Sequence, residues 1–253
     1  NYLEIYLKFL LLHPKQISFV MARKNNVEFD SIETISDVWN LLTDEQLAYL
    51  KANYLVRMYK KNEMVYCDGE VPTHVLCVAK GKLKIFRTGS GGRSQIVRMV
   101  KPGEMLAYRA MFAQENFVTN ACAFESSVIY MIPREVIKTL IRNNSELAWY
   151  FIHKLSVDLG IADKRAVSLT QKHVRGRLAE SLLFLRDNYG MEEDGATLSV
   201  HLSREDLASL SNMTTSNAIR TLSWMAQEKI IELDGRKIKI IDDTYLTSLS
   251  KNG

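Results

Sequence analysis

Short apolar runs separated by turn residues fill the chain over residues 54–133. Glycines punctuate these runs at roughly the 8–12-residue spacing that is typical of all-β sandwiches and barrels. Within LCVAKGKLKIF, Leu83 and Ile85 alternate with lysines, which predicts a strand with one buried and one hydrated face. Gly81 stands at the bend of the hairpin that we expect there. The pattern predicts a β-roll over residues 36–143.

After the β-rich region, the apolar residues change to the spacing of a helix. Apolar residues recur at spacings of four and three, which predicts a long helix over residues 144–171. Its apolar stripe is wider than a single β-domain would cover, and so long a helix is uncommon in a globular core. We therefore predict a helix that packs on its counterpart in a second copy, the alternative being a connector buried within one chain. The predicted dimer-helix residues are Leu147, Phe151, Leu155, Leu159, Ala162, Ala166 and Leu169.

The stretch from Leu202 to Gln227 predicts a helix, a tight turn and a second helix. Ser203 can cap the first helix, Ser211-Asn212 can end it, and Thr214 can cap the second. Apolar side chains at spacings of four and three give the second helix an inner face. Two short helices joined in this way form a helix-turn-helix, whose second helix enters the major groove of DNA. The alternative is an αα-hairpin in a small domain that binds no DNA.

A pair of apolar strands, IIELDGRKIKII, follows the second helix, with Asp234-Gly235 as its turn. A hairpin directly after a recognition helix is the wing of a winged helix, and basic residues at its tip usually meet phosphate. Residues 172–253 are thus predicted to form a winged helix-turn-helix, and the whole chain an α+β fold. The predicted base-contacting residues are Thr215, Ser216, Asn217 and Arg220, and the predicted wing contacts are Arg236 and Lys237.

The start of the chain differs from the rest. Tyr2–Leu12 is apolar, but Glu4 and Lys8 interrupt it, and it ends well short of the ~20 residues that a membrane span needs. It also lacks the cleavage site of a secretory signal. We predict that residues 1–35 form an N-terminal extension and that Met21 is the natural start. The alternative is an apolar helix that packs on the domain.

Composition narrows the class of protein only slightly. The 253 residues, 47% hydrophobic and 25% charged, suit one or two domains of a soluble globular protein. A net charge of +4 permits a nucleic-acid partner without arguing for one, so any DNA-binding charge must form a local patch. Cys67, Cys77 and Cys122 are scattered, which suits a reducing cytosol and offers no close metal-ligand spacing.

Several short motifs accompany this order of elements. They are Gly81-Lys82-Leu83-Lys84, Lys101-Pro102-Gly103-Glu104, Val174-Arg175-Gly176-Arg177-Leu178-Ala179 and LSREDLASLSNMTTSNAIRTL. Over about residues 36–242 the chain resembles the cyclic-AMP receptor protein/FNR superfamily of bacterial transcription regulators. The stretch GEMLAYRAMF and the TTSNAIR helix look most like the members found in Bacteroidetes.

The resemblance implies a cyclic-nucleotide-binding-like jelly roll and a homodimer that binds palindromic double-stranded DNA through paired major-groove helices. Ser203, Arg204 and Thr214 match phosphate-contacting positions of the family. Many members have a glutamate where Ser216 stands, and serine cannot accept from cytosine with equal selectivity. We therefore expect a target that differs from the common family sites, although Arg220 can still contact guanine.

The resemblance also places an effector pocket in the roll. Its candidate residues are Gly103, Glu104, Tyr108, Arg109, Phe117 and Val118. Phe117-Val118 stands where cyclic-nucleotide-binding members carry an arginine and a hydroxyl, and Arg109 is the only arginine near this segment, at its wrong end. We therefore predict no cyclic AMP binding in the family manner. The cysteine cluster of the iron–sulfur members is also missing, whereas His74 and His153 leave haem open. The alternative is that these pocket residues are plain core.

Three classes of function compete. The favoured one is a cytoplasmic DNA-binding regulator that contacts RNA polymerase and no membrane. The second is a sensor or interaction module whose winged domain binds protein rather than DNA. The third is an enzyme, which we do not expect because the sequence holds no GxxxxGK loop, nucleophile elbow or HExxH motif.

Overall fold

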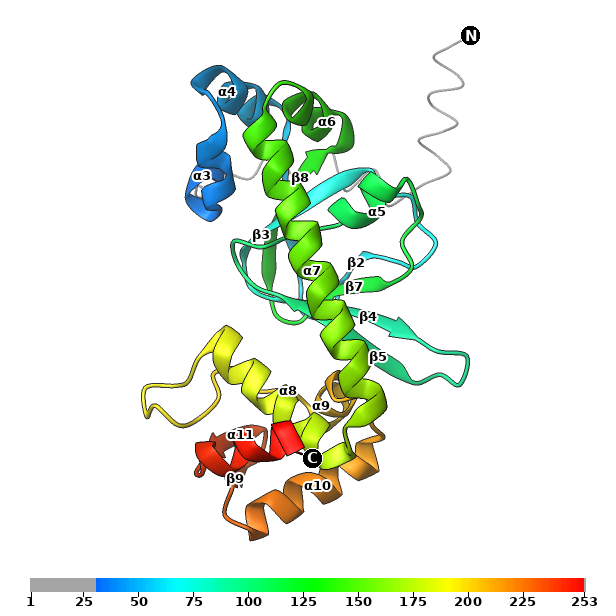
Figure 1. Ribbon diagram of the computed structural model, residues 1–253. Helices are drawn as coiled ribbons and strands as arrows, with labels where there is room; N and C mark the ends of the chain where they lie inside the picture. Colours follow the sequence, from blue (N-terminus) through cyan, green and yellow to red (C-terminus); the bar gives the residue numbers. More distant parts are fainter. Residues whose placement is uncertain (1–30, 253) are drawn as a thin grey trace.

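The computed structural model describes residues 31–252, so the predictions for residues 1–30 lie outside the described residues. The chain folds as a β-rich roll and a winged helical domain joined by one long helix (Figure 1). The helices are α3 (Ile32–Ile35), the 3-10 helix η2 (Asp37–Leu41), α4 (Asp44–Asn53), α5 (Tyr108–Ala113), α6 (Arg134–Arg142), α7 (Ser145–Gln171), α8 (Val174–Tyr189), α9 (Arg204–Leu210), α10 (Thr215–Gln227) and α11 (Asp243–Asn252). The strands are β1 (Leu55–Tyr59), β2 (Met64–Tyr66), β3 (His74–Lys80), β4 (Leu83–Thr88), β5 (Ser94–Val100), β6 (Met105–Leu106), β7 (Asn120–Ala123), β8 (Ser127–Pro133), β9 (Ile231–Asp234) and β10 (Lys237–Ile240).

Two four-stranded antiparallel sheets form the roll, in the orders β1-β8-β3-β6 and β2-β7-β4-β5. Leu83 and Ile85 are buried while Lys84 is partly exposed, as the alternation predicts. The predicted hairpin at Gly81 is wrong, because β3 and β4 belong to different sheets. Gly81 carries the chain from one sheet to the other with a φ of +79°, and a Cβ there would lie 2.4 Å from the Ser126 carbonyl oxygen. Only glycine fits this close crossing.

The segment before the roll is packed against it. Thr43 and Gln46 form a reciprocal capping box, which starts α4 as a helix separate from η2. Ile32, within the predicted extension, is fully buried in the same cluster as Trp39 and Leu50. The packed part of the chain thus begins before residue 36.

The long helix α7 begins after Asn144, whose side chain accepts a hydrogen bond from the Leu147 amide, and runs for 27 residues. Figure 1 shows it passing from α6 along the roll to the winged domain. Leu147 and Phe151 are buried in the roll's own core, so their prediction as partner-facing residues is wrong. Leu155 and Leu169 are half-buried, whereas Leu159, Ala162 and Ala166 are exposed. The helix therefore packs one side on its own chain and leaves apolar surface open elsewhere, as at Leu159.

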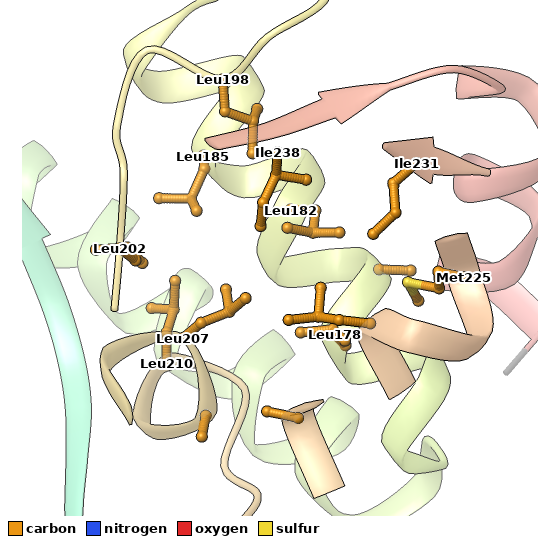
Figure 2. Packing of buried hydrophobic residues seen from close by; sticks show 14 of the residues in the cluster. Leu178, Leu182, Leu185, Leu198, Leu202, Leu207, Leu210, Met225, Ile231 and Ile238 are labelled. Atoms are coloured by element: carbon orange, nitrogen blue, oxygen red, sulfur yellow. The ribbon is translucent and has the colours of Figure 1, made fainter. Parts of the chain in front are cut away.

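Leucines and isoleucines from α8, α9 and the two wing strands meet in the core of the winged domain (Figure 2). β9 and β10 pair antiparallel with Lys237 opposite Asp234, which confirms the predicted hairpin. Two residues of β5, Ile96 and Met99, belong to this same cluster. The core of the winged domain is therefore continuous with the edge of the roll.

The contact between the two parts is built on the outer edge of β5. Ser209 of α9 donates its hydroxyl to the Ser94 carbonyl (2.9 Å) and accepts from the Ile96 amide (2.8 Å). Arg165 of α7 donates to the carbonyl groups of Ile96, Val97 and Leu210. An uncovered strand edge presents unpaired backbone groups. Here α9 and α7 supply the partners, which fixes the position of the helix-turn-helix against the roll.

Candidate nucleic-acid interface and effector cavity

The turn between α9 and α10 has the geometry that its residues predict. The Ser203 hydroxyl accepts a hydrogen bond from the Asp206 amide (3.0 Å) and caps α9. The Thr214 hydroxyl accepts from the Asn217 amide (3.2 Å) and caps α10. Between them, Asn212 adopts a left-handed conformation with a φ of +49°. Both predicted caps and the break at Ser211-Asn212 are confirmed.

Three of the four predicted base-contacting residues form the outer face of α10. Thr215, Ser216 and Arg220 are exposed, while Ala218, Leu222 and Met225 on the opposite face are buried. Asn217 lies between these faces and is half-buried. Its Oδ1 accepts a hydrogen bond from Arg220 Nη2 (2.6 Å). This contact extends the guanidinium along the helix surface, so Asn217 is placed to orient Arg220.

The predicted phosphate-contacting residues have separate roles in the structure. Arg204 Nη2 donates to the Gly235 carbonyl (2.7 Å) and thereby ties α9 to the wing turn. Burial lowers the pKa of the Arg204 guanidinium. Lys237 donates a hydrogen bond to Glu192 at 2.9 Å, and this bond and the opposite charges raise the lysine pKa and lower the carboxyl pKa. Arg236 is exposed at the wing tip.

A cleft of about 700 Å³ separates the roll from the helix-turn-helix. Ser203, Thr214, Thr215 and Arg236 line it on the winged side. On the roll side it is lined by residues of β4, β5 and the turn that follows β1, among them basic ones: Lys61, Lys84 and Arg93. Lys84 is paired with Asp206 of α9 at 2.6 Å, and Arg93 donates to Asn212 at 3.0 Å. Polar positions from both parts of the chain therefore meet around this cleft.

A second cavity, of about 440 Å³, lies between the roll and α7. Tyr108, Arg109, Phe117 and Val118 line it, and the Phe117 ring stacks on Tyr66 with ring centroids 3.8 Å apart. Gly103 and Glu104, the other two predicted pocket residues, do not line this cavity. They belong to the turn after β5, where the Glu104 carboxylate accepts from the Lys101 amide and the Gly103 amide donates to the Val78 carbonyl.

Arg98 of β5 also lines this cavity, so the prediction that Arg109 is the only nearby arginine is wrong. Its guanidinium pairs with Asp158 of α7 at 2.9 Å and contacts the Tyr108 hydroxyl, which also donates to Asp158. Burial alone would lower the Arg98 pKa, but Tyr108 and Asp158 outweigh it and the pKa lies above its usual value. Burial raises the Tyr108 pKa. A polar triad thus joins the cavity wall to the long helix.

The two histidine candidates stand on different elements. His74 begins β3 and is half-buried, and burial lowers its pKa. His153 is exposed on α7. Within residues 31–252, no group of three or more His, Cys, Asp or Glu side chains is placed to hold a metal ion. None of the described helices combines the length and apolar character needed to cross a bilayer.

Two family models match the chain. The cyclic nucleotide-binding domain matches residues 56–144, and the Crp-like helix-turn-helix domain matches residues 176–249. These ranges contain the second cavity's strands and the whole α9–α10 unit.

Known proteins match over most of their length. The CRP-like cAMP-activated global transcriptional regulator of Mycobacterium tuberculosis is 23% identical over 74% of this chain and 84% of its own. The Cyclic AMP receptor protein of Thermus thermophilus is 23% identical over 85% of this chain and 97% of its own. Among solved structures, FixK2 from Bradyrhizobium japonicum superposes with a TM-score of 0.70 at 20% identity, covering 78% of this chain and 96% of that one. With both domains matched in the order that the fold shows, the chain belongs to the CRP/FNR family of transcriptional regulators, which are DNA-binding proteins and not enzymes.

Proposed function

We propose that the chain acts as a homodimer that recognises a two-fold symmetric DNA site by placing α10 of each copy in the major groove. The observation that carries the proposal is the exposed face of α10, where Thr215, Ser216 and an oriented Arg220 stand on a capped, well-packed helix. Arginine can contact guanine O6 and N7 with two hydrogen bonds, and short hydroxyl side chains can contact several base edges. The wing residue Arg236 adds a phosphate contact.

Binding of fluorescent duplexes selected from random DNA tests this function. We expect a palindromic motif, salt-sensitive binding, and loss of sequence preference in Arg220→Ala, since that arginine supplies the guanine contact. Recovery of the half-sites that are common in the family would contradict our expectation that Ser216 gives this protein a different target sequence. Failure to bind any duplex, together with capture of a protein by the winged domain, would favour the interaction-module alternative.

Exposed apolar residues on α7 support the dimer. Ile152 is 52% exposed and Leu159 is 63% exposed, and these two residues lie on one side of the helix together with Ala166. Packing of two such helices would bury this side. Leu159→Glu should therefore give monomers in analytical ultracentrifugation. Ile161→Glu is the matched control, because Ile161 is equally exposed on the opposite side of the helix and its substitution should leave the dimer intact.

We also infer that the second cavity takes a small molecule other than cyclic AMP. Phe117 and Val118 offer no positive charge at its wall. The charges of the two arginines that line it are already matched, Arg98 by Asp158 and Arg109 by Glu115. Addition of cyclic AMP should leave the thermal midpoint unchanged, whereas a rise that Arg98→Gln abolishes would contradict the inference. An absorption spectrum of the protein from its native host tests the haem alternative at His74 or His153.

The output of binding is proposed to be regulation of promoters in the cytoplasm through contact with RNA polymerase or through occlusion. The stretch GEMLAYRAMF and the TTSNAIR helix support placing the chain among the Bacteroidetes members of the family. Genome-wide mapping of bound DNA would supply the motif and the regulated genes together.

A further inference from the structure

An apolar side chain stands on the recognition face of α10. Ile219 is 47% exposed, whereas its neighbour Ala218 is fully buried. Among the exposed large hydrophobic residues of the described chain, it is the one that α10 contributes. It follows Ser216 by three residues and precedes Ser223 by four, and both of these serines are exposed. Residues at these spacings are neighbours on a helix surface, so Ile219 lies among the polar residues of the outer face.

Stability does not account for isoleucine at this position. A β-branched side chain lowers helix propensity relative to alanine, and a side chain half-open to water gains little from burial. Single exposed apolar residues are common on protein surfaces. This one differs in its place, because Arg220 is the next residue and Thr215 lies one turn before it on the same exposed face.

The major groove offers one apolar group for such a side chain, which is the C5 methyl of thymine. Resting on the proposed DNA recognition by α10, we propose that Ile219 determines specificity by packing on a thymine methyl beside the base pair that Arg220 contacts. Ile219 and Arg220 lie on either side of the line joining Ser216 and Ser223, as their helical spacing requires. The two side chains therefore select different features, a methyl group and a pair of hydrogen-bond acceptors.

Replacement of thymine by deoxyuridine tests the proposal, because it removes the methyl group and leaves base pairing unchanged. The probe is the duplex recovered by selection with the full-length protein, with each thymine of one half-site replaced in turn. The wild-type protein should lose affinity at one position by about three-fold to ten-fold, the effect expected for one methyl group removed from water on binding. Ile219→Ala should bind the thymine and deoxyuridine duplexes equally at that position and keep the preference for guanine.

Ser223→Ala is the matched control, since it alters an exposed residue of the same face and should keep the wild-type difference between thymine and deoxyuridine. An unchanged thermal midpoint for Ile219→Ala would show that the variant is folded. The proposal is overturned if no thymine methyl affects wild-type binding, or if the effect persists in Ile219→Ala. If the wild-type protein bound no DNA, the role of Ile219 and the proposed function would fail together. That outcome is recognised because the selection would then yield no bound duplex.

Discussion

The hydroxyl of Ser209 joins the helix-turn-helix to the roll, and its removal has an effect that can be calculated. Ser209→Ala leaves the Ile96 amide and the Ser94 carbonyl without this partner at a contact where Ile96 is 1% exposed. A buried backbone group left without a partner costs about 1–3 kcal/mol, so we expect the loss of two such partners to weaken the contact by at least about 2 kcal/mol. Hydrogen exchange of the Ile96 amide should then accelerate by at least about thirty-fold.

Ser211→Ala provides the control for this measurement. Ser211 is also a buried serine of the same region, but its hydroxyl donates to Ser181 of α8 (2.9 Å), inside the winged domain. Its replacement should destabilise that domain while the Ile96 amide stays protected at its edge contact. Equal acceleration of Ile96 exchange in both variants, or none in Ser209→Ala, would refute the role assigned to Ser209.

Three further predictions concern single residues. Gly81→Ala should lower the free energy of unfolding by more than about 3 kcal/mol in urea titration, because of its positive φ and the blocked Cβ position, whereas Gly69→Ala, with a similar φ and open space around it, should cost about 1 kcal/mol. Hydrogen bonds from Thr197 and the backbone lower the Asp194 pKa from 3.8 to about 2, so this carboxylate stabilises the fold above pH 3.8 and the contribution disappears as the pH falls toward 2. In Asp194→Asn the thermal midpoint should depend less on pH over that interval. A pH dependence equal to that of the wild type would contradict the assignment. Thr43→Ala should cost about 1 kcal/mol by removing the capping box of α4, as circular dichroism melts can measure, and no change would show that the cap is dispensable.

Local patterns predicted the elements of the fold well, because each depends on neighbouring residues. The caps at Ser203 and Thr214 and the wing turn at Asp234-Gly235 follow from hydrogen bonding and turn geometry within a few residues. The strand pairing around Gly81 depended instead on which sheet each strand joins. A glycine between two apolar runs looks the same in a hairpin and in a crossing between sheets, so periodicity alone could not separate the two.

Contacts between distant segments limited the prediction of the sites. Phe151 and Leu159 follow one stripe in the sequence, yet the roll covers the former and not the latter. Arg98 was missed because it lies within the apolar half of β5, ten residues from Tyr108, and acquires its partner Asp158 only when α7 packs on the roll. A charged residue among apolar ones over residues 96–100 was the available signal.

The continuity of α7 joins the wall of the second cavity to the winged domain through one uninterrupted helix. Asp158 holds the cavity triad, and the helix continues without a break to Gln171, about 20 Å further on at 1.5 Å per residue. A tilt of about 10° of the helix about Asp158 would move its far end by about 3.4 Å and would pull Arg165 away from the Ile96 and Val97 carbonyl groups. A ligand that replaced Asp158 as the partner of Arg98 could therefore move the helix-turn-helix only by also breaking the Arg165 and Ser209 contacts that hold it on the roll.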